Sequence, residues 1–117
     1  MRIKYNVRDY AVTPTLKAFI NEKIGFSLSR FAQRIRVVIF SISQTRSNNG
    51  ELQCICVIKV KLNQYKTLVA EEQGRDMYLT VQACSYKAKR KIERHFYTSR
   101  TKTHRANMMQ YSRLKSE

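Results

Sequence analysis

The 117-residue sequence has little of several residue types, and each scarcity excludes something. It has one proline, three glycines and no tryptophan, and it lacks the run of about 18 apolar residues that a membrane-spanning helix needs. Its first residues alternate apolar and polar side chains, which is unlike a signal peptide, so we expect a cytoplasmic protein that does not enter membranes. The length predicts one compact domain.

Residues that bind metals or carry out acid–base catalysis are also scarce. There are three cysteines, and the spacing of Cys54 and Cys56 fits neither a disulfide framework nor a zinc site, so we interpret all three as small core residues. The adjacent Glu71 and Glu72 would point to opposite faces of a strand and could not act as a catalytic pair. We therefore expect no enzyme, metal, cofactor or small-molecule substrate. An RNA-processing enzyme is the alternative that a nuclease assay would test.

Negative charge is scarce as well. The chain has 8 Asp and Glu against 23 Lys and Arg, a net charge of +15 and a pI near 10.2. Repulsion among so many positive charges disfavours the compact state, and a polyanionic partner such as nucleic acid relieves this repulsion.

Apolar periodicity predicts the secondary structure. Strands are expected at 2–8, 35–43, 51–62 and 65–71, and helices at about 14–31 and from 77 to about 97. Thr13 before Pro14 is typical of a helix start, and Asp76 is a good cap for the second helix. The order β-α-β-β-β-α predicts an α+β fold in which both helices pack on one face of an antiparallel four-stranded sheet. Residues 1–97 are the expected domain, and residues 98–117 the expected basic, flexible tail.

The second helix carries a row of cations. At 100° per residue, Lys87, Arg90 and Arg94 share a stripe roughly opposite the apolar face, with Lys91 beside it, and Glu93 is expected to point elsewhere. Cations at this spacing repel one another, and a phosphate backbone would supply the missing negative charge.

Other side chains add to this basic surface. Lys17 and Lys23 flank the apolar stripe of the first helix, and the stem of Lys23 is expected to pack against that stripe. Most aromatic residues fall on apolar faces. The candidates for stacking on bases are Tyr10, Tyr65, Tyr97 and Tyr111.

Two segments carry a resemblance to a known family. The first is Gly74-Arg75-Asp76-Met77-Tyr78, followed by Lys87, Arg90 and Arg94-His95; the second is Val12-Thr13-Pro14 with Leu16, Lys17, Phe19 and Lys23. Over about residues 1–97 the chain resembles the ribosome hibernation-promoting factor and ribosome-associated inhibitor family, short form. In that family an Asp-Met-Tyr motif opens the second helix, and basic residues follow at these offsets.

The resemblance implies both a fold and a function. The fold is similar to a double-stranded-RNA-binding domain. The implied partner is the ribosome, bound through small-subunit rRNA in the channel between head and body by a protein that is monomeric when free. The implied function is a translation inhibitor that blocks the messenger and transfer RNA sites during stress or stationary phase. The rRNA contacts carried over are Lys87, Arg90, Arg94, Lys17 and Lys23, and Lys91 joins them from its place beside the row.

The second helix departs from the family pattern at three positions. Cys84, Ser85 and Ala88 stand where the family places larger aliphatic residues, so the second helix is expected to pack closer to the sheet or to be less stable. Promotion of ribosome dimers and stalling of single ribosomes are both possible outcomes of binding. A stand-alone double-stranded-RNA-binding module is the alternative function.

Overall fold

The structure is a computed structural model that describes residues 2–11 and 13–107, with side chains as far as residue 97. The elements are β1 (Arg2–Val7), α1 (Pro14–Leu28), the 3-10 helix η1 (Ser29–Arg34), β2 (Ile35–Arg46), β3 (Leu52–Leu62), β4 (Thr67–Gly74) and α2 (Met77–Asn107). Apart from η1, their order is the predicted β-α-β-β-β-α.

The four strands form one mixed sheet in the order β1-β2-β3-β4. The pairs β2–β3 and β3–β4 are antiparallel, as predicted, but β1 lies parallel to β2 with Tyr5 opposite Phe40. The expectation of an antiparallel sheet is therefore wrong for β1. The reason is that α1 returns the chain to the end of the sheet from which β1 began, and such a crossover connects parallel strands.

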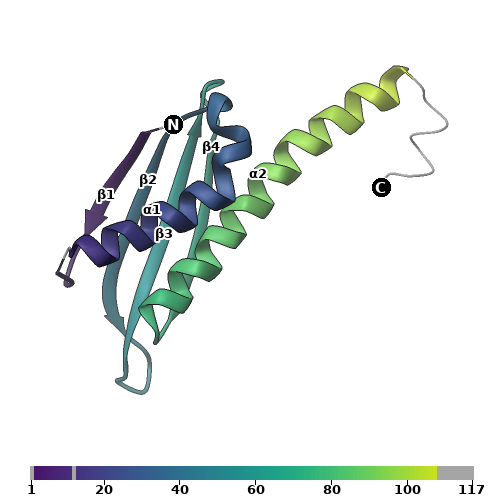
Figure 1. The fold of residues 1–117 in the computed structure, drawn as a ribbon. Coiled ribbons are helices and arrows are strands. Elements are labelled where there is room, and N and C mark those ends of the chain that lie inside the picture. The colour runs from purple at the N-terminus through teal and green to yellow at the C-terminus, as the bar shows by residue number, and fades with distance from the viewer. Residues whose placement is uncertain (1, 12, 108–117) are drawn as a thin grey trace.

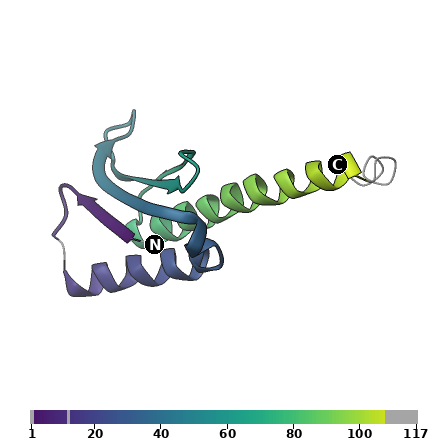
Figure 2. The same cartoon turned by 90° about the horizontal axis from the view of Figure 1, so that it is seen from above.

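Both helices cover the same face of the sheet and leave the other face open, as predicted (Figures 1 and 2). The core lies between the helices and the sheet. From α1 it receives Leu16, Ile20, Ile24 and Leu28, and from α2 it receives Val81, Cys84, Ala88 and Ile92, which pack on inward-facing residues of β2 and β3. All three cysteines are buried and free, which confirms their interpretation as core residues.

The predicted helix starts are confirmed by side-chain caps. The Leu16 amide donates to Oγ1 of Thr13 at 3.0 Å, and the Leu79 amide donates to Oδ1 of Asp76 at 3.0 Å. Just before α2, Gly74 is required by a close approach, because a Cβ there would lie 2.6 Å from Oγ1 of Thr80. This glycine lets the first turn of α2 lie directly against the end of β4.

Both helix ends differ from the prediction. α1 ends at Leu28, and the residues up to 34 form η1 instead of a further α-helical turn. α2 does not end at 97 but continues to Asn107 and extends past the sheet (Figure 1). The segment 98–107 contains neither glycine nor proline, so nothing in its backbone stops a helix that is already nucleated. Of the tail predicted over 98–117, residues 98–107 are therefore helical, and residues 108–117 lie outside the described residues.

Candidate nucleic-acid interface

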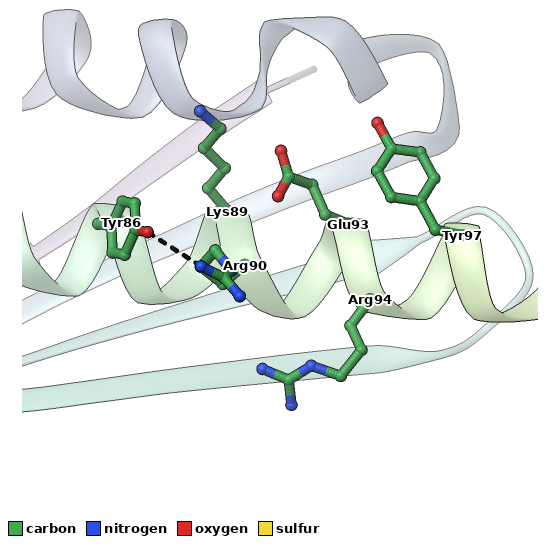
Figure 3. A pocket seen from close by; sticks show the side chains of 6 residues that line it. All are labelled: Tyr86, Lys89, Arg90, Glu93, Arg94 and Tyr97. Atoms are coloured by element: carbon green, nitrogen blue, oxygen red, sulfur yellow. Dashed lines mark hydrogen bonds between the residues drawn. The ribbon is translucent and has the colours of Figure 1, made fainter. Parts of the chain in front are cut away.

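The exposed side of α2 carries a shallow depression of about 400 Å³. It is lined by Tyr86, Lys89, Arg90, Glu93, Arg94 and Tyr97, and Figure 3 shows Arg94 extending away from the neighbouring helix. Three cations, Lys89, Arg90 and Arg94, line the depression within two helical turns. Two of the three, Arg90 and Arg94, are predicted site residues.

Arg90 is held in place by its own helix. Its Nη1 donates to the hydroxyl of Tyr86 at 3.0 Å, and its guanidinium lies 5.8 Å from the centroid of the Tyr86 ring. The hydrogen bond to Tyr86 raises the pKa of Arg90 above its ordinary value, and an arginine is charged at physiological pH in any case. Among the side chains described, neither Arg90 nor Arg94 takes part in an ion pair. Both are exposed, and their charge is available to a partner.

Glu93 corrects one expectation. It does not point elsewhere but lines the same depression, and its Oε2 lies 3.8 Å from Nη1 of Arg30 in η1. Arg30 also donates a hydrogen bond to the hydroxyl of Tyr97. The carboxylate therefore faces a cation from a different element, which limits how much it offsets the charge of the α2 arginines.

Lys87 and Lys91 correct a second expectation, because they do not lie opposite the core but reach over the edge of the sheet. Nζ of Lys87 donates to the carbonyl of Glu71 at 2.9 Å and lies 3.2 Å from Oε2 of Glu72. Nζ of Lys91 donates to the carbonyl of Val69 at 2.7 Å. β4 is an edge strand, and the two lysines supply donors to carbonyls that have no neighbouring strand.

The α1 lysines lie on different sides of their helix. Nζ of Lys17 is 5.5 Å from the centroid of the Tyr5 ring in β1, whereas Nζ of Lys23 is 5.5 Å from the ring of Phe19. Because Phe19 packs edge-on against Tyr78 of α2, Lys23 lies on the side facing α2 and is half-buried, as expected. Lys17 and Lys23 therefore do not form one cluster.

Sequence reasoning missed Lys89 and Tyr86 as site residues. Tyr86 is 56% exposed, and it precedes Arg90 by one helical turn. The spacing of four residues between Tyr86 and Arg90 is the feature of the sequence from which this contact could have been predicted. Of the predicted stacking residues, Tyr65 and Tyr97 are exposed. Tyr10 instead packs partly buried against the core, and Tyr111 lies outside the described residues.

Other kinds of site find no support in the part of the chain that is described. It holds no group of three or more His, Cys, Asp or Glu side chains placed to bind a metal ion. No helix within it has the length and apolar character needed to cross a membrane. The pKa of Cys56 is raised by its hydrogen bond with Cys84 and by burial, which keeps this thiol protonated and unreactive.

Fold and site together define a small α+β domain with a basic helical surface. A family model described as "Sigma 54 modulation protein / S30EA ribosomal protein" matches residues 3–97, and the chain belongs to this family. The family predicted from the sequence is thereby confirmed.

Two solved structures have a similar fold. One is a ribosomal subunit interface protein from Coxiella burnetii, with a TM-score of 0.66 and 21% identity, covering 83% of this chain and 99% of that chain. The other is the N-terminal domain of Protein Y from Thermus thermophilus, with a TM-score of 0.66 and 17% identity, covering 81% of this chain and 99% of that domain. No curated protein sequence matches the chain.

Proposed function

We propose that this protein is a translation inhibitor that binds small-subunit rRNA in the decoding channel and promotes ribosome hibernation during stress or stationary phase. The observation that carries the proposal is the exposed Arg90–Arg94 pair on α2, which has no carboxylate partner among the described side chains. Arginine suits this role because its planar guanidinium can donate two parallel hydrogen bonds to one phosphate.

The proposed mechanism is occupancy without chemistry. α2 is fixed on the sheet by buried residues from Val81 to Ile92, so its outer face presents the cations on a rigid support. A rigid basic domain in the channel would exclude messenger and transfer RNA by volume, while phosphate contacts supply the affinity. The family description also names sigma 54 modulation. The uncompensated positive charge favours an RNA partner over that role.

The decisive experiment is sedimentation of purified ribosomes with the protein in sucrose gradients. We expect the protein to sediment with the small subunit, to be released by messenger and transfer RNA, and to inhibit translation in proportion to its occupancy. The gradient also shows whether ribosome dimers form. Binding to an isolated RNA duplex as tight as binding to ribosomes would instead support the stand-alone double-stranded-RNA-binding module.

The salt dependence of ribosome binding tests the electrostatic part of the proposal. If phosphate contacts dominate, the logarithm of affinity should fall linearly with the logarithm of salt concentration, by roughly 0.7–0.9 per contact. An affinity that stays constant between low and moderate salt would contradict the proposal.

A further inference from the structure

The open face of the sheet carries a second cluster of cations, which the proposed function does not use. Arg2, Lys4, Arg36, Val37 and Lys61 line a depression of about 510 Å³ at the end of the sheet where β1 begins. Val37 is only 9% exposed, yet it does not belong to the core between sheet and helices. It is the apolar part of a surface whose other lining residues are all basic.

The strand register arranges these cations in rows. Arg2 of β1 and Lys61 of β3 both lie opposite Val37, and one step along the same face, Lys4 and Lys59 both lie opposite Ile39. The two rows are about 7 Å apart along the strands, because every second residue shares a face. Two lines of cations therefore run along the sheet, with Arg2 and Lys4 on β1 and Lys59 and Lys61 on β3. The apolar strip of β2 between the two lines carries Val37 and Ile39.

This cluster has little negative charge near it. Among the described side chains, none of these cations takes part in an ion pair. The one carboxylate that the strands carry on this face is Glu71, which lies opposite Val57, beyond the Lys59 row. Self-repulsion within the cluster is therefore uncompensated in the free protein.

Tyr65 adds an unusual feature at the same end of the sheet. It lies in the β3–β4 turn, is 89% exposed, and has the guanidinium of Arg36 at 5.8 Å from its ring centroid. Its φ is 62°, in the left-handed region where hairpin turns of this kind prefer glycine. A bulky residue held in this conformation with its ring in solvent makes little contact that would stabilise the fold, and such outliers cluster at functional sites.

From this arrangement we infer that the open sheet face is a second RNA-binding site, which holds the phosphates of a single strand between the two lines of cations on β1 and β3 while a base stacks on Tyr65. The inference deepens the proposed function and rests on it for RNA as the partner. Cations along a groove together with an exposed aromatic ring are the combination that binds single-stranded nucleic acid. Because this face is opposite the helices, a bound protein would contact RNA on both sides.

The test isolates the sheet face by measuring binding of a short labelled single-stranded RNA in an R90E/R94E background. Adding K4E/K59E should weaken this binding about tenfold at low salt and lower its salt slope by roughly 1.4, since a single strand contributes about 0.7 per contact. The matched control is R8E/R46E, which makes the same charge change at the opposite end of the sheet, where the Arg8 amide donates to Ile42 and Arg46 ends β2. The control should change binding by about twofold or less.

Substitution of Tyr65 separates binding from stability. Y65G should raise the melting temperature by relieving the left-handed conformation, and it should weaken RNA binding without changing the salt slope. A tyrosine with a structural role would instead lower the melting temperature when removed. Circular dichroism checks that every variant is folded.

Three outcomes would overturn the inference: equal losses from K4E/K59E and R8E/R46E, unchanged RNA binding in Y65G, or tighter binding of polyglutamate than of RNA, which would indicate an acidic protein partner. Failure of the wild-type protein to sediment with ribosomes would overturn the proposed function instead. The oligonucleotide measurements would still decide whether the sheet face binds RNA.

Discussion

Two pairs of cations on α2 have the same charge and the same spacing of four residues, yet they lie in different surroundings. Lys87 and Lys91 donate hydrogen bonds to main-chain carbonyls of β4, and Lys87 also pairs with Glu72. Arg90 and Arg94 face the shallow depression on the outer side of the helix. The lysine pair thus donates hydrogen bonds to carbonyls at the sheet edge, whereas the arginine pair is available to a ligand. A helical row of basic residues is therefore not a single site.

The largest effect is expected on ribosome binding when the charges of each pair are reversed and the two variants are compared. R90E/R94E should weaken binding about a hundredfold or more, because it removes two phosphate contacts and adds repulsion. K87E/K91E makes the same change in net charge and should weaken binding less. Sedimentation at a fixed salt concentration measures both variants. Equal losses would mean that the two pairs do not differ in function.

The position of α2 over β4 underlies the whole comparison, and G74A tests it. The added Cβ would lie 2.6 Å from Oγ1 of Thr80, so the first turn of α2 must shift, at a cost of about 1–3 kcal/mol in the free energy of unfolding. Denaturant unfolding measures this loss. Combining G74A with T80A, which removes the clashing oxygen, should recover part of it relative to T80A alone. An undiminished loss in the double variant would show that the clash is not the cause.

The lysine pair should contribute more than the arginine pair to the free energy of unfolding, which is the reverse of their expected order in ribosome binding. K87M/K91M keeps the apolar stems but removes the donors to the carbonyls of Glu71 and Val69, and it should cost about 1 kcal/mol, a modest value because these groups are partly exposed. R90M/R94M should leave the free energy of unfolding nearly unchanged, because both arginines are exposed. Urea denaturation of both variants measures the difference, and equal costs would contradict the edge-capping role of the lysines.

The smallest expected effect concerns Ser85, on the buried side of the same helix. Its hydroxyl oxygen is buried and, among the described groups, has no hydrogen-bond partner. S85A removes this unsatisfied group with little change in volume, so it should stabilise the fold by about 1 kcal/mol or less and leave ribosome binding unchanged. Thermal unfolding checks the sign, and a destabilised variant would show that the hydroxyl has a partner after all.

The sequence by itself determined the order of the elements, the two helix starts and most of the core. Capping by Thr13 and Asp76 and the apolar spacing within each helix are local properties, set by residues within a few positions of one another. The sequence also identified the family and, within the predicted site, the two exposed arginines. The family followed from the resemblance of its motifs, and the two arginines followed from helical periodicity, which needs no knowledge of what packs beside the helix.

Only the tertiary structure decided which cations of α2 contact the sheet edge and which line the depression. Helical geometry places Lys87 in the predicted stripe. Whether Lys87 and Lys91 reach the main-chain carbonyls of β4 depends instead on how α2 crosses the sheet. The parallel pairing of β1 and the rows of cations on the open face likewise depend on strand register between residues 20 or more positions apart. Such contacts follow from packing of the whole chain, which local periodicity does not encode.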